Sequence, residues 1–335
     1  MSVSCSSQTS LWVVIPLANE AEVLPELYKR LFQTLDTLDL PTQVMFVDDG
    51  SHDASWSILC RFAAQDERIH AVRLSRNFGK EIALTAGLDA VAARDDVACA
   101  VVMDADLQDP PEVIVKLLNR WREGHDVVYA TRARREGETA FKKFTAAAFY
   151  RVMEVLSDTP VPRDTGDFRL LSKRALQALS GLRERRRFMK GLFAWIGYSQ
   201  AQVCYVREPR AGGHTSWNYG KLWRLAVDGI TAFSTVPLRF ATWLGVLASL
   251  FAFSYGLWVI GKALWLGNNV PGYPSLMAVI LFLGGVQLLA LGVLGEYIGR
   301  IYTESKQRPM YLIAETTRIA AHLLAEGGPP QETKG

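Results

Sequence analysis

The sequence contains few cysteines, and no two of them have the spacing of a metal site or a redox motif. The four are Cys5, Cys60, Cys99 and Cys204. This excludes a cysteine-based zinc or dithiol motif, and we interpret all four as reduced thiols, with Cys99 in the core of a strand. The first ten residues have no basic region and no apolar core. We therefore expect no secretory signal peptide and a cytosolic N-terminal domain.

Charge is limited as well. The formal net charge is +3, and 21% of the 335 residues are charged. So small an excess does not by itself indicate a nucleic-acid partner. Hydrophobic residues make up 49% of the chain, which excludes global disorder and suffices for one large domain or two smaller ones. We find no internal repeat.

The first half of the chain alternates strand-like and helix-like segments. Strands are predicted at residues 11–15, 43–47, 69–74, 98–103 and 126–130. Helix starts are predicted at the capping pattern Asn19-x-x-Glu22, at Asp53, near Gly79 and at Asp109, which precedes two prolines and Glu112. This alternation predicts an α/β fold with a mostly parallel, doubly wound sheet.

Three polar motifs follow predicted strands, at residues 16–20, 48–51 and 104–108. In doubly wound sheets, ligands bind outside the carboxyl ends of the strands. Asp104 and Asp106 can reach one hard cation, and Gln108 can add a neutral oxygen, so Mg²⁺ or Mn²⁺ is favoured over zinc. The alternatives are an acidic turn at Asp104 and a tight turn at Asp48 and Asp49.

Other polar segments have two interpretations each. Arg76 and Lys80 lie between a strand and a helix, where they suit phosphate oxygens or form a solvated loop. Residues 166–170 are either functional or a turn before a helix near Ser172. Two basic clusters suit a solvated face, lipid headgroups or a lipid phosphate. These clusters are Arg132, Arg134, Arg135, Lys142 and Lys143, and Arg183, Arg185, Arg186 and Arg187.

Two long apolar segments predict membrane spans, at residues 240–261 and 275–295. Residues 217–236 form an amphipathic stretch suited to the membrane interface. Basic residues gather on the outer flanks of the spans, so the N-terminal half and the C-terminal tail are expected in the cytoplasm. The predicted division is a cytosolic domain at 1–216, interfacial amphipathic helices at 217–237, a two-helix membrane region at 238–299 and a cytosolic tail at 300–335.

The motifs occur together in one order, which resembles a known family. They are residues 15–20, 48–51, 76–80, 104–112, 166–170, 187–191 and 294–302. The set is similar to polyprenyl-phosphate glycosyltransferases of glycosyltransferase family 2, including bactoprenol glucosyltransferases and dolichol-phosphate mannose synthases. The resemblance covers about residues 10–312. One departure is Leu17-Ala18, where many relatives have an aromatic residue.

The resemblance implies a GT-A catalytic domain, Rossmann-like in its sheet, and an inverting transfer of glucose from UDP-glucose to undecaprenyl phosphate. It implies that Asp104, Asp106 and Gln108 hold Mg²⁺ or Mn²⁺. It also implies a set that binds the nucleotide sugar, and an acid, Asp167, that faces the acceptor. The nucleotide-sugar set is Pro16, Asn19, Glu20, Asp48, Asp49, Lys80 and Asp104.

The chemistry of the acceptor gives an independent expectation. A lipid phosphate is already an anion at neutral pH, so it needs alignment and partial neutralisation rather than a strong general base. Arg132, Arg135, Lys142 and Arg210 are the candidates for that work, and Arg132 and Arg135 are counted with Asp104, Asp106 and Asp167 as catalytic. Asp167 is interpreted as an orienting residue.

Several alternatives stay open. The donor could be UDP-N-acetylglucosamine, GDP-mannose or a UDP-aminoarabinose derivative, and the chain could instead be a non-catalytic scaffold that binds nucleotide sugar. A processive synthase is disfavoured because it would need more spans and a Gln-x-x-Arg-Trp motif. A transporter is disfavoured because neither predicted span carries an interior charge. The expected location is the bacterial inner membrane, as a homo-oligomer. The resemblance suggests a tetramer through the membrane helices, where Gly284, Gly285 and Gly292 would permit close packing.

Overall fold

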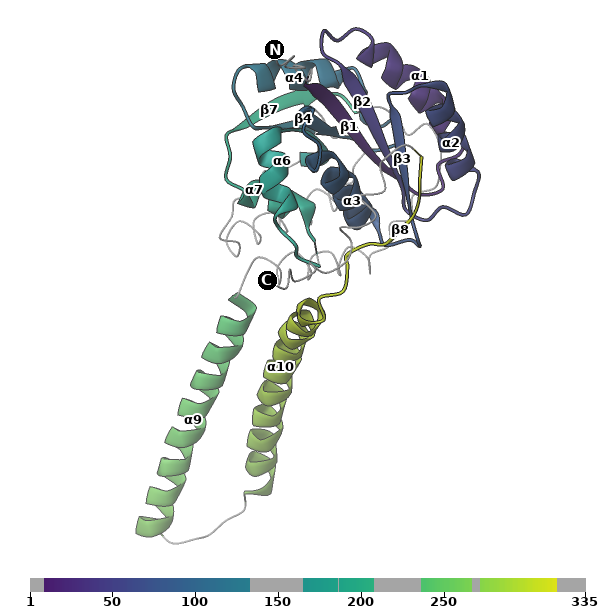
Figure 1. The fold of residues 1–335 in the computed structure, drawn as a ribbon. Coiled ribbons are helices and arrows are strands. Elements are labelled where there is room, and N and C mark those ends of the chain that lie inside the picture. Colours follow the sequence, from purple (N-terminus) through teal and green to yellow (C-terminus); the bar gives the residue numbers. More distant parts are fainter. Residues whose placement is uncertain (1–8, 133–164, 186, 208–235, 267–271, 318–335) are drawn as a thin grey trace, which may run out of the picture.

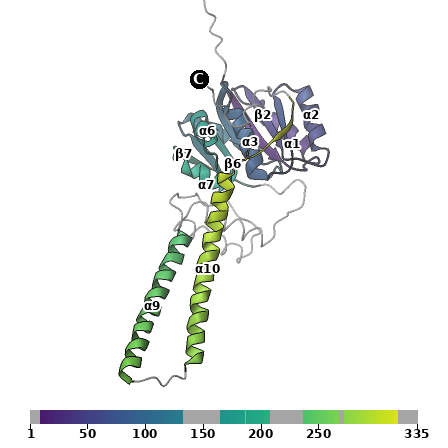
Figure 2. The ribbon, with the colours of Figure 1, turned by 60° about the horizontal axis from the view of Figure 1, so that its bottom comes forward.

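The computed structural model describes residues 9–132, 165–185, 187–207, 236–266 and 272–317 (Figure 1). These residues form an α/β domain and a long helical hairpin that extends away from it (Figures 1 and 2). The predicted interfacial stretch at 217–236 lies almost entirely outside the described residues.

The α/β domain is built on one mixed sheet with the strand order β7-β5-β6-β4-β1-β2-β3-β8. The strands are β1 Ser10–Leu17, β2 Thr42–Asp48, β3 Ile69–Leu74, β4 Val97–Val102, β5 Val127–Arg132, β6 Thr165–Ser172, β7 Gln200–Tyr205 and β8 Ile313–Thr316. Strand β1 pairs in parallel with β2 and β4, β2 with β3, and β5 with β7. The mostly parallel sheet is thus confirmed. The strand pattern did not predict β6, β7 or β8, and β6 and β8 run antiparallel to their neighbours.

Helices cover both faces of this sheet. They are α1 Leu24–Leu35, α2 Ser55–Gln65, α3 Lys80–Ala92, α4 Val113–Arg122, α6 Lys173–Ser180 and α7 Met189–Trp195. One apolar core joins the sheet to α1, α2 and α4, and a second joins it to α3, α6 and α7. Along β1, Val13 and Ile15 enter the first core and Trp12 and Val14 the second. A strand buried on both faces explains the uninterrupted apolar run in the sequence.

Helix α3 lies very close to the sheet at Gly87. A Cβ atom at this position would lie 2.5 Å from Val14 Cγ1 and 2.8 Å from Val47 Cγ2. Any side chain would therefore push α3 away from β1 and β2. Gly87 thus permits the packing that holds the first residue of α3, Lys80, at the carboxyl edge of the sheet.

The predicted helix starts need correction in two places. Helix α1 begins at Leu24 without a side-chain cap, so the capping box of Asn19 and Glu22 is wrong. Asn19 instead has φ 57° and accepts a hydrogen bond from His52 N. Helix α4 begins at Val113, also without a side-chain cap, and Asp109 accepts from the Tyr205 hydroxyl instead.

Two other helix starts agree with the sequence. Asp53 Oδ1 accepts from the amide of Ser55, the first residue of α2, at 2.9 Å. Helix α6 follows Ser172, whose hydroxyl accepts from Ala175 N. The segment before Ser172 is a strand, however, so the interpretation of residues 166–170 as a turn is wrong.

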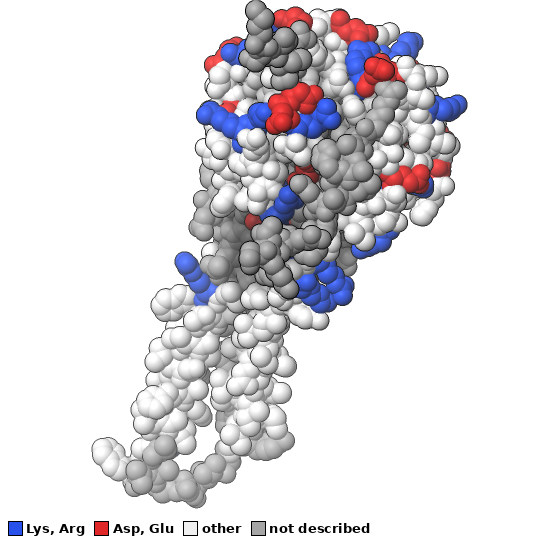
Figure 3. Space-filling model, viewed as in Figure 1, with Lys and Arg blue, Asp and Glu red and all other residues white. Residues whose placement is uncertain are grey.

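The hairpin consists of α9 Val236–Leu266 and α10 Tyr273–Ser305. Each helix contains an apolar stretch long enough to cross a membrane, at Leu238–Val259 and Leu276–Ser305. In the most apolar parts of these stretches only 6% and 0% of the residues are buried, so the two helices do not pack as core helices against the described part of the chain. Figure 3 shows the visible surface of the hairpin without charged side chains, with Lys and Arg at the end next to the α/β domain. The protein is therefore membrane-associated.

Candidate active site

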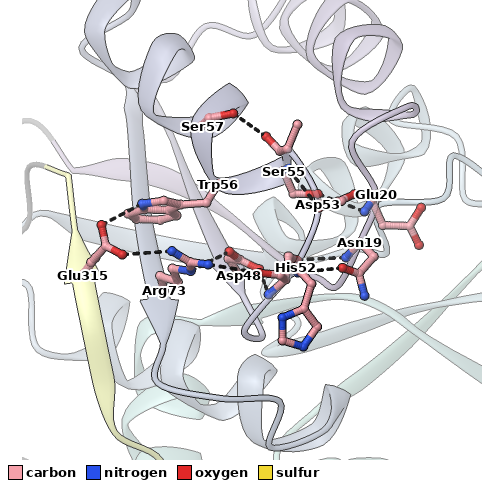
Figure 4. A network of polar contacts seen from close by, with 12 residues as sticks. Asn19, Glu20, Asp48, His52, Asp53, Ser55, Trp56, Ser57, Arg73 and Glu315 are labelled. Atoms are coloured by element: carbon pink, nitrogen blue, oxygen red, sulfur yellow. Dashed lines mark hydrogen bonds and ion pairs between the residues drawn. The ribbon is translucent and has the colours of Figure 1, made fainter.

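The loops after β1 and β2 are joined by hydrogen bonds at the carboxyl edge of the sheet (Figure 4). Asn19 N donates to Ser51 Oγ at 2.9 Å, and His52 N donates back to Asn19 Oδ1 at 2.9 Å. Glu20 N donates to Ser55 Oγ at 3.0 Å. The two loops thus form one continuous rim, as expected for motifs that follow neighbouring parallel strands.

Asp48 and Asp49 have different roles in this rim. Asp48 is fully buried, and its Oδ1 accepts from Ser51 N at 2.9 Å while Oδ2 lies 3.5 Å from Arg73 Nε. The Asp49 oxygens accept from the backbone amides of Phe78 and Gly79, at 2.7 and 2.9 Å. Burial raises the pKa of Asp49, and these amide bonds oppose the shift. Asp49 therefore holds the loop before α3.

Gly50 permits the close approach of these two loops. It has φ +66°, and a Cβ atom there would lie 2.5 Å from the carbonyl carbon of Arg76. In the Asp-Asp-Gly-Ser motif, the glycine is thus required for backbone packing, in addition to the contacts that the side chains of the motif make. Beside it opens a pocket of about 320 Å³ between the ends of β2, β3 and β8. Its lining includes Ser51, His52, Arg73, Asn77 and Glu315.

Lys80 lies between two carboxylates that come from different strands. Its Nζ is 2.7 Å from Asp104 Oδ1, just beyond β4, and 2.6 Å from Asp167 Oδ2 in β6. Burial alone would lower the pKa of Lys80, but the two carboxylates outweigh it and raise that pKa above its usual value. Burial would likewise raise the pKa of Asp167, but Lys80 and Lys190 hold it well below its usual range. Both groups are charged at neutral pH.

A second layer of charged residues supports this centre. Glu81 Oε2 accepts from Met189 N at the start of α7, and burial together with Asp167 raises the pKa of Glu81 to about 7. Arg169 is 4% exposed, and its guanidinium lies 3.8 Å from the Phe193 ring centroid and donates to the Gly166 carbonyl at 2.8 Å. These contacts fix β6, and with it Asp167, against α7.

The carboxylates after β4 fit a hard divalent cation by their chemistry. Asp106 is 6% exposed, and its Oδ1 accepts from Gln108 N at 3.1 Å. Leu107, between them, has φ 57° and bends the chain there. The described residues hold no group of three or more histidine, cysteine or acidic side chains suited to a metal. Two carboxylates are nevertheless the set that Mg²⁺ uses when substrate phosphates complete its coordination.

The predicted acceptor-binding residues are described only in part. Arg132 ends β5, opposite Tyr205 in the register of β5 and β7, while Arg135, Lys142 and Arg210 lie outside the described residues. In the second basic cluster, Arg183 pairs with Asp89, and Arg185 binds Glu304. These two arginines therefore have partners within the protein, rather than forming a purely solvated face.

Sequence reasoning assigned no role to several residues that the fold brings to this edge. They are Arg73, Glu81, Arg169, Lys190 and Glu315. Glu81 adjoins Lys80, Arg169 lies within the motif at residues 166–170, and Lys190 lies within the motif at residues 187–191, so these three had a local signal. Arg73 and Glu315 had none, because they meet only through pairing of β3 with β8.

Two domain families match the chain. A glycosyl transferase family 2 domain matches residues 12–180, which include Lys80, Asp104 and Asp167. The chain belongs to glycosyltransferase family 2. A GtrB C-terminal hairpin domain matches residues 236–301, which cover α9 and most of α10. The resemblance noted in the sequence is thus confirmed, the α/β domain is the GT-A-like domain of this family, and the protein is a glycosyltransferase.

Individual relatives cover nearly the whole chain. An uncharacterized glycosyltransferase of Synechocystis sp. is 50% identical over 91% of this chain and 95% of its own. The bactoprenol glucosyl transferase of Shigella phage SfV is 45% identical over 90% of this chain and 97% of its own. Among solved structures, mannosyl-3-phosphoglycerate synthase from Rubrobacter xylanophilus aligns over 79% of each chain at 17% identity, with a TM-score of 0.44.

Proposed function

We propose that this glycosyltransferase transfers glucose from UDP-glucose, with inversion, to the phosphate of undecaprenyl phosphate. The observation that carries the proposal is its similarity to the bactoprenol glucosyl transferase of Shigella phage SfV over 97% of that protein. The match of α9 and α10 to a GtrB C-terminal hairpin supports a lipid acceptor. A charged centre at the carboxyl edge of the sheet supplies the chemistry.

The donor nucleotide is proposed to lie along the rim formed by the loops after β1 and β2. Pro16, Asn19 and Glu20 would line it, and Asp48 would lie near the base or ribose. The pocket of about 320 Å³ beside Ser51 and His52 is within the size of small-ligand pockets. Asp49 would act indirectly, because its carboxylate holds the loop that precedes Lys80.

Transfer needs charge stabilisation more than proton removal. The acceptor phosphate oxygen forms the new bond to the anomeric carbon while the bond from that carbon to the UDP oxygen breaks. A divalent cation held by Asp104, Asp106 and Gln108 would stabilise the negative charge of the departing UDP. Lys80 would add a fixed positive charge beside it. Asp167 would orient the acceptor or sugar, since its lowered pKa makes it a weak base.

The acceptor side would be supplied by cations and by the hairpin. Arg132, Arg135, Lys142 and Arg210 are proposed to neutralise the lipid phosphate. The two helices would span the bacterial inner membrane, with the catalytic domain and the C-terminus in the cytoplasm. They would also support a homo-oligomer, proposed to be a tetramer. The lipid tail can then stay in the bilayer while its phosphate reaches the catalytic centre.

A donor panel tests this proposal. The purified full-length protein is incubated with undecaprenyl phosphate, Mg²⁺ or Mn²⁺, and one labelled donor at a time. The donors are UDP-glucose, UDP-N-acetylglucosamine, GDP-mannose and a UDP-aminoarabinose derivative. Label in the lipid extract from UDP-glucose alone is the expected result. Transfer from another donor would correct the sugar, and nucleotide binding without any transfer would favour a binding-only scaffold.

A further inference from the structure

The chain returns from the membrane hairpin directly to the catalytic domain. At the end of α10, Glu304 Oε1 accepts from Arg185 N at 2.8 Å. Further along, the Tyr311 hydroxyl donates to Asp89 Oδ2 at 3.0 Å, and Ser75 N donates to the Leu312 carbonyl at 2.8 Å. The segment then forms β8 on the edge of the sheet beside β3 (Figure 1). It is therefore fixed on the domain rather than trailing from the membrane.

Within this strand, Glu315 lies directly opposite Arg73 of β3. Glu315 Oε1 is 2.9 Å from Arg73 Nη1, and Oε2 accepts from Trp56 Nε1 on α2 at 2.9 Å (Figure 4). Directly opposite residues of opposite charge stabilise an antiparallel pair. Both oxygens of Glu315 are thus engaged, and its carboxylate fixes one side of the Arg73 guanidinium.

The other side of that guanidinium faces the rim of the proposed donor site. Arg73 Nη2 donates to the Ser51 carbonyl at 3.0 Å, and Arg73 Nε lies 3.5 Å from Asp48 Oδ2. Ser51 in turn accepts from Asn19 N. A continuous series of contacts therefore runs from Glu315 through Arg73 to the loops after β2 and β1.

Both Glu315 and Arg73 also line the pocket of about 320 Å³. The Arg73 side chain is 30% exposed, so without a partner in β8 its guanidinium would have rotamers that turn away from Asp48. Ordering it beforehand lowers the cost of binding a ligand there.

We propose that Glu315 is a positioning residue for the donor nucleotide and acts through Arg73. Strand β8, which follows the membrane hairpin, then contributes to the donor site. This inference rests on the proposed function in that it places a nucleoside diphosphate along this rim.

The test measures binding of free UDP to the full-length protein by calorimetry, alongside donor kinetics. Glu315→Gln keeps the size of the side chain and an oxygen for Trp56 but loses the charge that pairs with Arg73. It should weaken UDP binding about two- to fivefold, the range for partly exposed ion pairs. The KM for the donor should rise by the same factor, with kcat and the melting temperature close to wild type. Glu123→Gln is the matched control, because Glu123 is as exposed as Glu315 and pairs with Arg120; it should leave UDP binding unchanged.

Arg73→Met and the double variant decide whether Glu315 acts through Arg73. Arg73→Met should weaken UDP binding at least as much, and adding Glu315→Gln should weaken it no further. Unchanged UDP affinity in Glu315→Gln, or fully additive effects in the double variant, would overturn the inference. If the wild type prefers another nucleoside diphosphate, the same series is measured with that nucleotide. Nucleotide binding is measured separately from sugar transfer, so an absence of transfer contradicts the proposed function alone, whereas unchanged nucleotide binding in Glu315→Gln contradicts this inference.

Discussion

Replacing Lys80 by methionine tests the charged centre most severely, because this single ammonium contacts two carboxylates. Breaking a buried ion pair from one side costs about 3–5 kcal/mol of stability. The Lys80 side chain is 45% exposed, so solvent screening should reduce the loss in free energy of unfolding to about 1–2 kcal/mol. The loss in kcat/KM should be larger, about 10²- to 10³-fold, as for other preorganised charges that stabilise a transition state.

The same substitution should change the pH dependence of the reaction. Lys80 holds the pKa of Asp167 below its usual range, so Asp167 stays ionised throughout the working range of the wild type. Without Lys80, burial would raise that pKa, and the acidic limb of kcat/KM would move to higher pH. Initial rates of label transfer over a pH series measure both effects. Lys116→Met, on the exposed face of α4, is the control. If Lys80→Met has the same activity and pH profile as Lys116→Met, the proposed role of the Lys80 charge is refuted.

Three further predictions concern the residues around this centre. Asp49→Asn removes one of the two acceptor oxygens that bind the loop before α3. The free energy of unfolding should therefore fall by about 1–3 kcal/mol, and kcat should fall as well. A variant with unchanged stability and unchanged kcat would contradict the role of Asp49. Burial and Asp167 raise the pKa of Glu81 from 4.5 to about 7, so ionising Glu81 costs stability as the pH rises through this interval. Glu81→Gln should therefore make the melting temperature less dependent on pH across that range, which thermal unfolding at a series of pH values would measure. Chelation should abolish sugar transfer and Mg²⁺ or Mn²⁺ restore it, whereas full activity in chelator would exclude a metal role for Asp106.

The predictable part of the site followed from the parallel strands. Their carboxyl ends meet at one edge, so the motifs after β1, β2 and β4 could be placed together from their positions in the sequence. The membrane hairpin could be predicted as well, because its apolar stretches are longer than those of ordinary core helices. The positions of the motifs in the sequence thus suffice to predict one site that contains Asp48 and Asp104.

The unpredicted part depends on contacts between distant residues. Lys80 and Asp167 are 87 residues apart, and their pairing requires β6 to run antiparallel to β4. The four residues of β8 have no local signal as a strand, because pairing with β3 determines their conformation. Asp109 has the local features of a helix cap, yet a tyrosine 96 residues away provides its partner. Tertiary partners override local propensity in each of these cases.

The most direct test of the proposed reaction follows a single label. Radiolabelled glucose from UDP-glucose is measured in the lipid extract after incubation with undecaprenyl phosphate and the wild-type protein, Asp106→Asn or Asp95→Asn. Asp95 is an exposed carboxylate outside the site, so its variant serves as the matched control. We expect label in the lipid with the wild type and Asp95→Asn, and almost none with Asp106→Asn. Equal transfer by all three would contradict the assignment of Asp106, and no transfer by the wild type would contradict the proposed reaction.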